Sequence, residues 1–252
     1  MKSVAIHGVP RSGTSWIGSI FDSSPNVVYR HQPLFAYEFK SYLGEQSSKK
    51  EIRKFFELLA ETKDDFVLQT KEKASGAIPE FSKREPTHIV YKEGRYHNIV
   101  RNLLEKDDEM TVIGIVRNPK SVISSWYLAP KEFKKDEWDI KKEWRKARLK
   151  NEDRPEEFYG YDKWKEVTKL FLKLQKKYPK RFYLLDYANL LEDTKNEVRK
   201  VFDFCGLEYT KQTEEFISGS QEKDLSADAY SVFRKNQTDD KLVFASEIAE
   251  KE

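Results

Sequence analysis

The sequence predicts an α/β fold: one domain with a central parallel β-sheet flanked by helices. Short strand-like runs alternate with helical patterns along the chain, as they do in parallel sheets wrapped by helices. Several of these runs are apolar throughout, which is typical of strands covered on both faces. The chain has 252 residues and no internal repeat or linker-like stretch, so we expect a single domain over residues 1–252.

Six runs of residues favour strands by their length and their apolar character. In chain order they are Val4–His7, Val27–Tyr29, Phe66–Gln69, His88–Lys92, Thr111–Val116 and Arg181–Leu185.

The helices are indicated by periodicity and by signals at their ends. Ser48 with Glu51, and Thr194 with Glu197, have the spacing of capping boxes, and Gly206 is placed to stop the second of these helices. Two further helices are predicted, over Thr14–Phe21 and over Tyr161–Tyr178, the latter ended by Pro179.

Two segments stand apart from this alternation. Residues 130–158, here called the flap, are highly charged, carry Trp138 and Trp144 and lack strand signals, so they predict a helical insertion. Residues from about 240 to 252 are expected to form a loosely docked tail.

The charge balance gives no reason to infer nucleic-acid binding, because 46 basic and 43 acidic residues leave a net charge of only +3. The single cysteine, Cys205, is expected in the core. Four histidines and one cysteine show no metal-ligand spacing, so no metal is expected. No apolar run approaches 18 residues and no signal-peptide pattern precedes the first strand; we therefore expect a soluble, cytoplasmic protein. The sequence carries no sign of its oligomeric state.

The strongest motif is the loop between the first strand and the first helix, Gly8-Val-Pro-Arg-Ser-Gly-Thr-Ser-Trp16. A tight loop that ends at a helix N-terminus directs several backbone N–H groups toward one anion. Gly13 permits a positive φ, Thr14 and Ser15 add hydroxyl donors, and Arg11 adds positive charge. A Walker A loop would have lysine after its last glycine, where this chain has Thr14.

A second motif lies at the end of the strand over residues 111–116. Arg117-Asn-Pro follows that strand, and Ser125 comes eight residues after the arginine. Because ligands of α/β proteins bind at the carboxyl ends of the strands, a guanidinium and a hydroxyl in this place suit a phosphate monoester.

Together the motifs resemble those of the family of sulfotransferases that use 3′-phosphoadenosine 5′-phosphosulfate (PAPS). Residues 11–16 match the family's 5′-phosphosulfate loop, and Arg117-Asn-Pro with Ser125 matches its 3′-phosphate motif. Residues 182–190 look like the family's strand that ends in a tyrosine near the adenine, here Tyr187, and residues 204–207 resemble its Phe-Leu-Gly-Leu segment. The resemblance implies a P-loop-like α/β fold and sulfuryl transfer from PAPS to an acceptor hydroxyl, without a metal.

The resemblance also implies which residues bind PAPS, leaving 3′-phosphoadenosine 5′-phosphate (PAP) as product. Near the C-terminus, Arg234-Lys235-Asn236 is similar to the family's Arg-Lys-Gly segment at the 3′-phosphate, and a plain basic loop is the alternative reading. The implied set is Arg11, Ser12, Gly13, Thr14, Ser15, Trp16, Arg117, Ser125, Tyr187, Arg234 and Lys235.

The chain departs from the family at the expected catalytic base. Members commonly carry Lys-Thr-His after the third strand, where this chain has Lys92-Glu93-Gly94, and carbohydrate-modifying members often carry glutamate at the place of Gln32. His31, beside that place, is the first candidate base and Glu93 the second. His97 is the third, on a helix where a solvent-facing position is expected. Lys92 and Arg11 are expected to stabilise charge during transfer.

The acceptor is expected to be a carbohydrate, because Arg11 resembles the carbohydrate-modifying branch and the flap is rich in aromatic and polar residues. A lipid, steroid or phenolic acceptor is the alternative. Two further classes stay open: a nucleotide phosphotransferase, and a nucleotide-binding protein without catalytic activity.

Overall fold

The computed structural model describes residues 1–222. The strands are β1 Lys2–His7, β2 Val27–His31, β3 His88–Glu93, β4 Thr111–Val116 and β5 Phe182–Asp186. The longer helices are α1 Thr14–Asp22, α2 Lys49–Glu61, α5 Val100–Lys106, α6 Pro119–Tyr127, α7 Ile140–Lys146, α9 Tyr161–Lys177, α11 Thr194–Cys205 and α12 Lys211–Glu222. The short helices are η1 Pro33–Phe35, α3 Asp65–Leu68, α4 Thr70–Ala74, η2 His97–Ile99, α8 Arg148–Asn151 and α10 Tyr187–Glu192.

The five strands form one parallel sheet in the order β2-β3-β1-β4-β5, which confirms the predicted α/β fold. The central strand, β1, pairs with β3 on one side and with β4 on the other. The carboxyl ends of the strands therefore meet at one edge of the sheet, where α/β proteins bind ligands.

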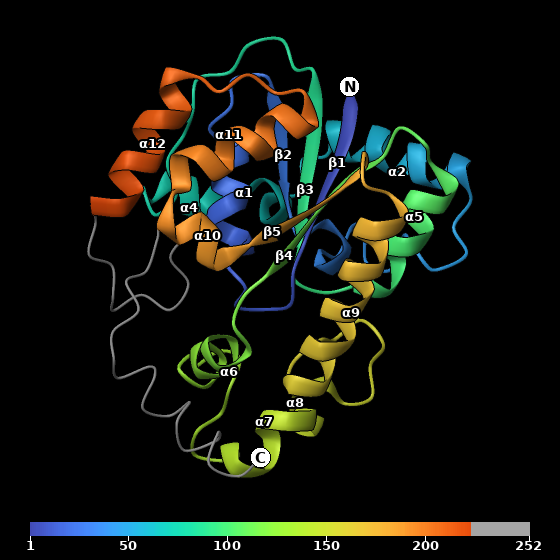
Figure 1. Cartoon of the computed structure of the whole chain (residues 1–252), viewed down its shortest axis with the longest axis vertical. Coiled ribbons are helices and arrows are strands. Elements are labelled where there is room, and N and C mark those ends of the chain that lie inside the picture. The colour runs from blue at the N-terminus through green and yellow to red at the C-terminus, as the bar shows by residue number, and fades with distance from the viewer. Residues whose placement is uncertain (223–252) are drawn as a thin grey trace.

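Helices cover both faces of the sheet, as Figure 1 shows. Along β1 the side chains alternate: Val4 and Ile6 pack with α1, α10, α11 and α12, and Ala5 packs in a second cluster with α2, α5 and α9. Both clusters are closed to solvent, so the sheet is buried on both faces as the apolar strand runs predict. Cys205 lies in the first cluster, as expected.

One of the predicted strands is wrong. Residues 66–69 belong to the helical turn α3 and its end, because the Asp64 side chain accepts a hydrogen bond from the amide of Val67. Only Val67 of this turn is buried, and Phe66 is exposed. A short apolar run does not distinguish a strand from a helical turn, and here the capping aspartate decides.

The helix ends follow the sequence signals with one correction. The capping box of Ser48 and Glu51 is present, and Gly206 ends α11 in the left-handed conformation. The cap of α11, however, is Asp193 rather than Thr194, whose hydroxyl donates instead to the carbonyl of Leu190. Two adjacent residues that both cap helices leave the boundary uncertain by one position in the sequence.

The flap carries α7 and α8 and forms a small separate core together with α6. Buried residues of α6, the flap and its end form this cluster: Ile123, Trp126, Phe133, Ile140, Ala147 and Tyr159. Trp138 and Trp144 pack against the cluster.

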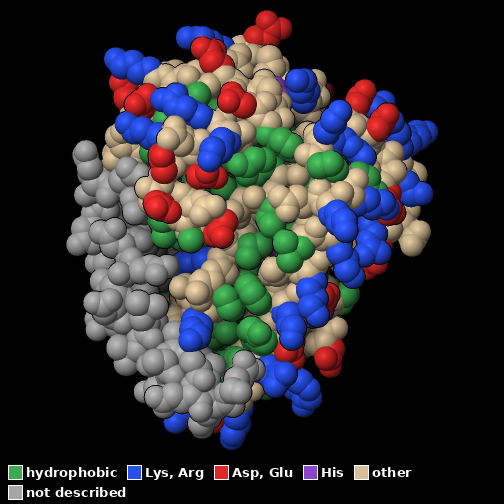
Figure 2. Space-filling model, viewed as in Figure 1, with side chains coloured by type: hydrophobic (Ala, Val, Ile, Leu, Met, Phe, Trp, Pro, Cys, Tyr) green, Lys and Arg blue, Asp and Glu red, His purple; other side chains and the backbone are tan. Residues whose placement is uncertain are grey.

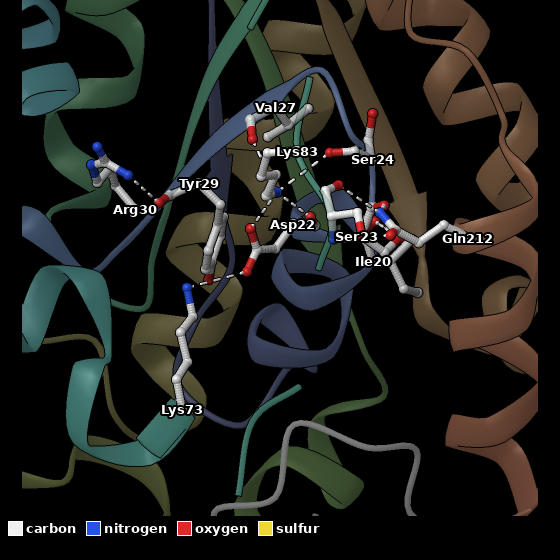
Figure 3. Close-up of polar contacts among 11 residues, drawn as sticks. Ile20, Asp22, Ser23, Ser24, Val27, Tyr29, Arg30, Lys73, Lys83 and Gln212 are labelled. Carbon is white, nitrogen blue, oxygen red and sulfur yellow. Dashed lines mark hydrogen bonds and ion pairs between the residues drawn. The ribbon is translucent and has the colours of Figure 1, made fainter. Parts of the chain in front are cut away.

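A lysine anchors the connection before β3 to the end of α1. The ammonium of Lys83 donates to the carboxylate and carbonyl of Asp22 and to the carbonyls of Ser24 and Val27 (Figure 3). Lys73 also approaches the Asp22 carboxylate, at 3.6 Å. This contact holds the C-terminal end of α1, whose other end meets the loop over residues 8–16, here called the phosphate loop after the role that the sequence predicts for it.

The surface is mixed in charge. Basic and acidic side chains intermingle around the margins of the face in Figure 2, and hydrophobic side chains gather near its middle. Among the described helices, none is long and apolar enough to cross a membrane.

Candidate active site

The candidate site lies where β1, β2 and β3 end side by side. The Gly8 amide donates to the Glu93 carbonyl, at 3.4 Å, and the Gln32 amide donates to the Lys92 carbonyl, at 2.9 Å. His31 stands opposite Lys92 in the strand register. The phosphate loop, the end of β3 and the turn after β2 are thus joined at one edge of the sheet.

The loop has features that favour the binding of an anion. Gly13 takes a φ of 91° and offers the first turn of α1 no side-chain cap. Ser12 is fully buried, and its Oγ has no hydrogen-bond partner among residues 1–222. Thr14 is buried and Ser15 half-buried at the helix start. Uncapped amides at a helix N-terminus attract negative charge.

Tyr187 closes one side of the loop. A Cβ at Gly13 would lie 2.3 Å from Tyr187 Cε2, so glycine is required by contact as well as by φ. Trp16 meets Tyr187 edge to face, with ring centroids 6.3 Å apart, and its indole N–H donates to Ser220 Oγ. Because Trp16 is itself buried, it supports Tyr187 more than it offers a face of its own.

Arg117, Ser125 and Arg11 come together at the end of β4. The Arg117 guanidinium donates to the Arg11 carbonyl at 3.0 Å and lies 4.8 Å from the Tyr187 ring centroid. Arg11 Nε donates to Ser125 Oγ at 3.2 Å. Arg117 Nε has no partner in the described part of the chain, and burial lowers the pKa of Arg117. A buried guanidinium with an unused donor suits an anionic ligand.

Lys92 and Glu93 are buried neighbours whose pKa values are shifted in opposite directions. Burial lowers the pKa of Lys92 to about 8, against the effect of Glu93 and Glu132. Burial raises the pKa of Glu93 to about 8, although its Oε1 accepts from the Leu34 amide at 2.8 Å. Its Oε2 has no partner within the described residues. Two groups with strongly shifted pKa values beside a predicted anion site are typical of active sites.

His31 is the most accessible of the three candidate bases. It is half-buried at the end of β2, whereas Glu93 and His97 are fully buried. The Gln32 side-chain nitrogen lies 3.1 Å from His31 Nε2, and an amide N–H in this place can only donate. Burial lowers the pKa of His31 well below 6.5, and Lys92 adds to the shift. The imidazole is therefore neutral near neutral pH.

The expected solvent-facing position of His97 is wrong. His97 lies on η2 and is fully buried, with Nδ1 3.1 Å from His7 Nδ1. His7 Nε2 meets the Tyr91 hydroxyl at 3.0 Å. Burial lowers the pKa of both histidines, so they form a neutral network in the core. His7 and His88, both on strands, are buried and hydrogen-bonded.

Sequence reasoning missed two residues beside the site. Glu132, at the start of the flap, places Oε1 3.8 Å from Arg11 Nη1. Arg95 follows β3, pairs with Glu157 at 2.9 Å, and lies 3.9 Å from the Phe35 ring centroid. No motif contains either residue, and only the packing of the flap brings Glu132 to the loop.

Two predicted residues, Arg234 and Lys235, lie outside the described residues, as does the predicted tail. Within residues 1–222, no group of three or more histidine, cysteine, aspartate or glutamate side chains is arranged to hold a metal ion.

A family model described as "Sulfotransferase domain" matches residues 2–247 of the chain. A search of curated protein sequences found no significant match.

Solved structures share the fold at low sequence identity. The sulfotransferase domain of the olefin synthase of Synechococcus PCC 7002 has a TM-score of 0.51 and 15% identity, covering 98% of this chain and 94% of that one. The sulfotransferase domain from the curacin biosynthetic pathway has a TM-score of 0.51 and 13% identity, covering 98% and 96%. Retinol dehydratase, solved with androsterone and the inactive cofactor PAP, has a TM-score of 0.51 and 14% identity, covering 99% and 80%.

Proposed function

The chain belongs to the sulfotransferase family, and from this premise we propose that it moves the sulfuryl group of PAPS to a hydroxyl of an apolar or aromatic acceptor, with His31 as base. The family accounts for sulfuryl transfer in general; the donor, the acceptor and the roles of single residues are the proposal.

The observation that carries the PAPS assignment is the set of unused polar groups around the loop. Ser12 Oγ and Arg117 Nε are buried without partners among residues 1–222, and the first turn of α1 has no side-chain cap. Leaving such groups unsatisfied costs about 1–3 kcal/mol each. Anionic oxygens would accept from all three, so the residues fit a ligand with separate phosphate groups.

PAPS supplies the sulfuryl group, which passes to the acceptor oxygen as the bond to the 5′-phosphate breaks. The loop amides, Ser12 and Arg11 bind the 5′ end, and Arg117 and Ser125 bind the 3′-phosphate. Tyr187, with Trp16 behind it, flanks the adenine. Lys92 places a positive charge at the end of β3, where it stabilises the charge that develops during transfer.

His31 is the proposed base because of its access and its charge. A base must first reach the acceptor hydroxyl, and Glu93 is fully buried beneath the turn that carries Leu34. The lowered pKa of His31 keeps its imidazole neutral, and the ring takes the proton at Nε2 when the Gln32 amide turns away from it. Glu93 is then a positioning residue: it holds the turn after β2 through the Leu34 amide and raises the pKa of Lys92.

The mouth beside His31 is aromatic. Phe66 meets the His31 ring at 5.4 Å and the Phe35 ring at 5.7 Å, and both phenylalanines are more than 40% exposed, at 41% and 45%. Phenyl rings bury apolar surface but bond no hydroxyls. The flap aromatics on which the expectation of a carbohydrate rested pack into the flap's own core instead. These contacts favour the lipid, steroid or phenolic alternative.

Calorimetry and a turnover assay test this proposal. We expect PAP to bind at least tenfold more tightly than AMP or ADP, because only PAP carries the 3′-phosphate. Labelled PAPS should transfer sulfate to a phenol or sterol in preference to a sugar. Equal affinity for the three nucleotides would contradict the PAPS site, and preference for a sugar would restore the carbohydrate assignment.

A further inference from the structure

Glu132 approaches the one arginine that the phosphate loop supplies. Its Oε1 lies 3.8 Å from Arg11 Nη1, which is an ion-pair distance but too long for a hydrogen bond. Arg11 is positioned by other contacts, because its Nε donates to Ser125 and its carbonyl accepts from Arg117. The carboxylate is therefore not needed to hold the guanidinium in place.

Two hydrogen bonds hold the backbone of Glu132 in place, so a movement of the flap does not carry the carboxylate away from Arg11. The carbonyl of Glu132 accepts from the indole N–H of Trp126, at 3.1 Å, and its amide donates to the carbonyl of Ala129. Trp126 and the next residue, Phe133, are buried in the flap's core. Only the side chain of Glu132 is left to respond to a ligand.

The carboxylate is also poorly satisfied where it stands. Oε2 is buried and has no hydrogen-bond partner among residues 1–222. A carboxylate with an unsatisfied buried oxygen and a long ion pair is held weakly, because it lacks the donors that normally compensate desolvation. The Glu132 carboxylate thus lies beside Arg11 without the hydrogen bonds that a permanent ion-pair partner would make.

We propose that Glu132 competes with the anionic nucleotide for Arg11 and so weakens nucleotide binding. This inference rests on the proposed function, because it takes Arg11 as a ligand of the 5′-phosphosulfate. The carboxylate stands in for the anion when the site is empty, and binding of the nucleotide requires Arg11 to exchange one anion for another. Release of the product PAP is favoured by the same exchange in reverse, and product release limits the turnover of many enzymes.

The test is PAP affinity in Glu132→Gln, measured by calorimetry. The amide keeps the size of the side chain and removes its charge, so we expect the Kd for PAP to fall by about 3- to 30-fold. Glu137→Gln is the matched control, since it removes the same charge from an exposed flap residue that pairs only with Lys134 among the described residues. Its Kd should equal that of the wild type. Thermal unfolding of both variants shows whether each is folded.

A second pair of variants tests whether the effect acts through Arg11. In an Arg11→Ala background, the change in log Kd for PAP caused by Glu132→Gln should be less than half of the change in the wild-type background. Unchanged or weaker PAP binding in folded Glu132→Gln overturns the inference. An equal gain in PAP affinity in both backgrounds also overturns it, because Glu132 would then repel the nucleotide without acting through Arg11. Wild-type protein that binds no PAP refutes the proposed function instead, so the two failures are distinguishable.

Discussion

The ring of Tyr187 lies directly on Gly13: a Cβ added to Gly13 would be 2.3 Å from Cε2 and 2.8 Å from Cδ2 of the tyrosine. The contact joins the first residue after β5 to the turn after β1, two segments separated by more than 170 residues. It ties the shape of the phosphate loop to the aromatic residue that is proposed to flank the adenine.

This contact makes Gly13 sensitive to the smallest substitution. Gly13→Ala should destabilise the protein by about 1–3 kcal/mol, because alanine is strained at a φ of 91° and displaces Tyr187. PAP affinity should fall at least tenfold, since both the loop and the ring move. Chemical denaturation and calorimetry measure the two effects. Gly44→Ala is the control, because a Cβ there meets no atom within 4 Å. Normal PAP affinity in folded Gly13→Ala would show that the loop does not bind the nucleotide.

Arg117 is expected to contribute to nucleotide binding and little to stability. Arg117→Ala removes a charge-assisted contact of about 1.5–3 kcal/mol, so PAP affinity should fall about ten- to a hundredfold. The guanidinium also bonds the Arg11 carbonyl, so a small loss of stability should accompany it. The exposed Arg101 provides the comparison, and Arg101→Ala should bind PAP normally. If the affinity of Arg117→Ala for PAP falls to the affinity of the wild type for AMP, Arg117 contacts the 3′-phosphate. If the affinity of the variant for PAP is unchanged, the 3′-phosphate lies elsewhere.

Local signals in the sequence predicted the five strands and the turn at Gly13. In β4 every residue after Thr111 is apolar, and Gly13 takes the positive φ that its place before a helix allows. The run Phe66–Gln69 failed because four residues carry too little periodicity, and the cap from Asp64 selected a helical turn.

The electrostatics of the site depend on packing that the sequence does not display. The shifts of Lys92 and Glu93 arise from burial beneath the turn after β2, and the approach of Glu132 to Arg11 arises from the fold of the flap. His97 was misplaced for the same reason: it shares a buried contact with His7, 90 residues earlier in the chain. Long-range contacts of this kind need the tertiary structure.

Lys83 is expected to stabilise the fold from a position outside the site. Lys83→Met keeps the aliphatic chain and removes the ammonium that bonds the carboxylate of Asp22 and three carbonyls. Because the side chain is 39% exposed, solvent screening limits the loss to about 1–3 kcal/mol. The melting temperature should fall by about 3–10 °C. Lys50→Met, on the exposed face of α2, should melt within about 2 °C of the wild type. Equal melting temperatures for the two variants would show that the Asp22 contact contributes nothing.

The pH dependence of turnover distinguishes His31 from Glu93 as the base. Burial and Lys92 lower the pKa of His31 well below 6.5, so a His31 base is already deprotonated at neutral pH. Protonation of His31 should then leave the rate level near neutrality and lower it only in acid. Above neutrality the rate should decline as Lys92, with a pKa of about 8, loses its charge. Lys92→Arg should remove this alkaline decline, because arginine stays charged. A Glu93 base would instead give a rate that rises through a pKa of about 8.

Variants complete the test. His31→Ala should lower kcat by about 10²–10⁴-fold with PAP affinity nearly unchanged, and added imidazole should restore part of the rate. Glu93→Gln should keep the Leu34 contact through its amide oxygen and lose much less activity. Because Glu93 raises the pKa of Lys92, its neutralisation should also move the alkaline decline to lower pH. A large loss in Glu93→Gln, beside near-normal turnover in His31→Ala, would transfer the role of base to the carboxylate.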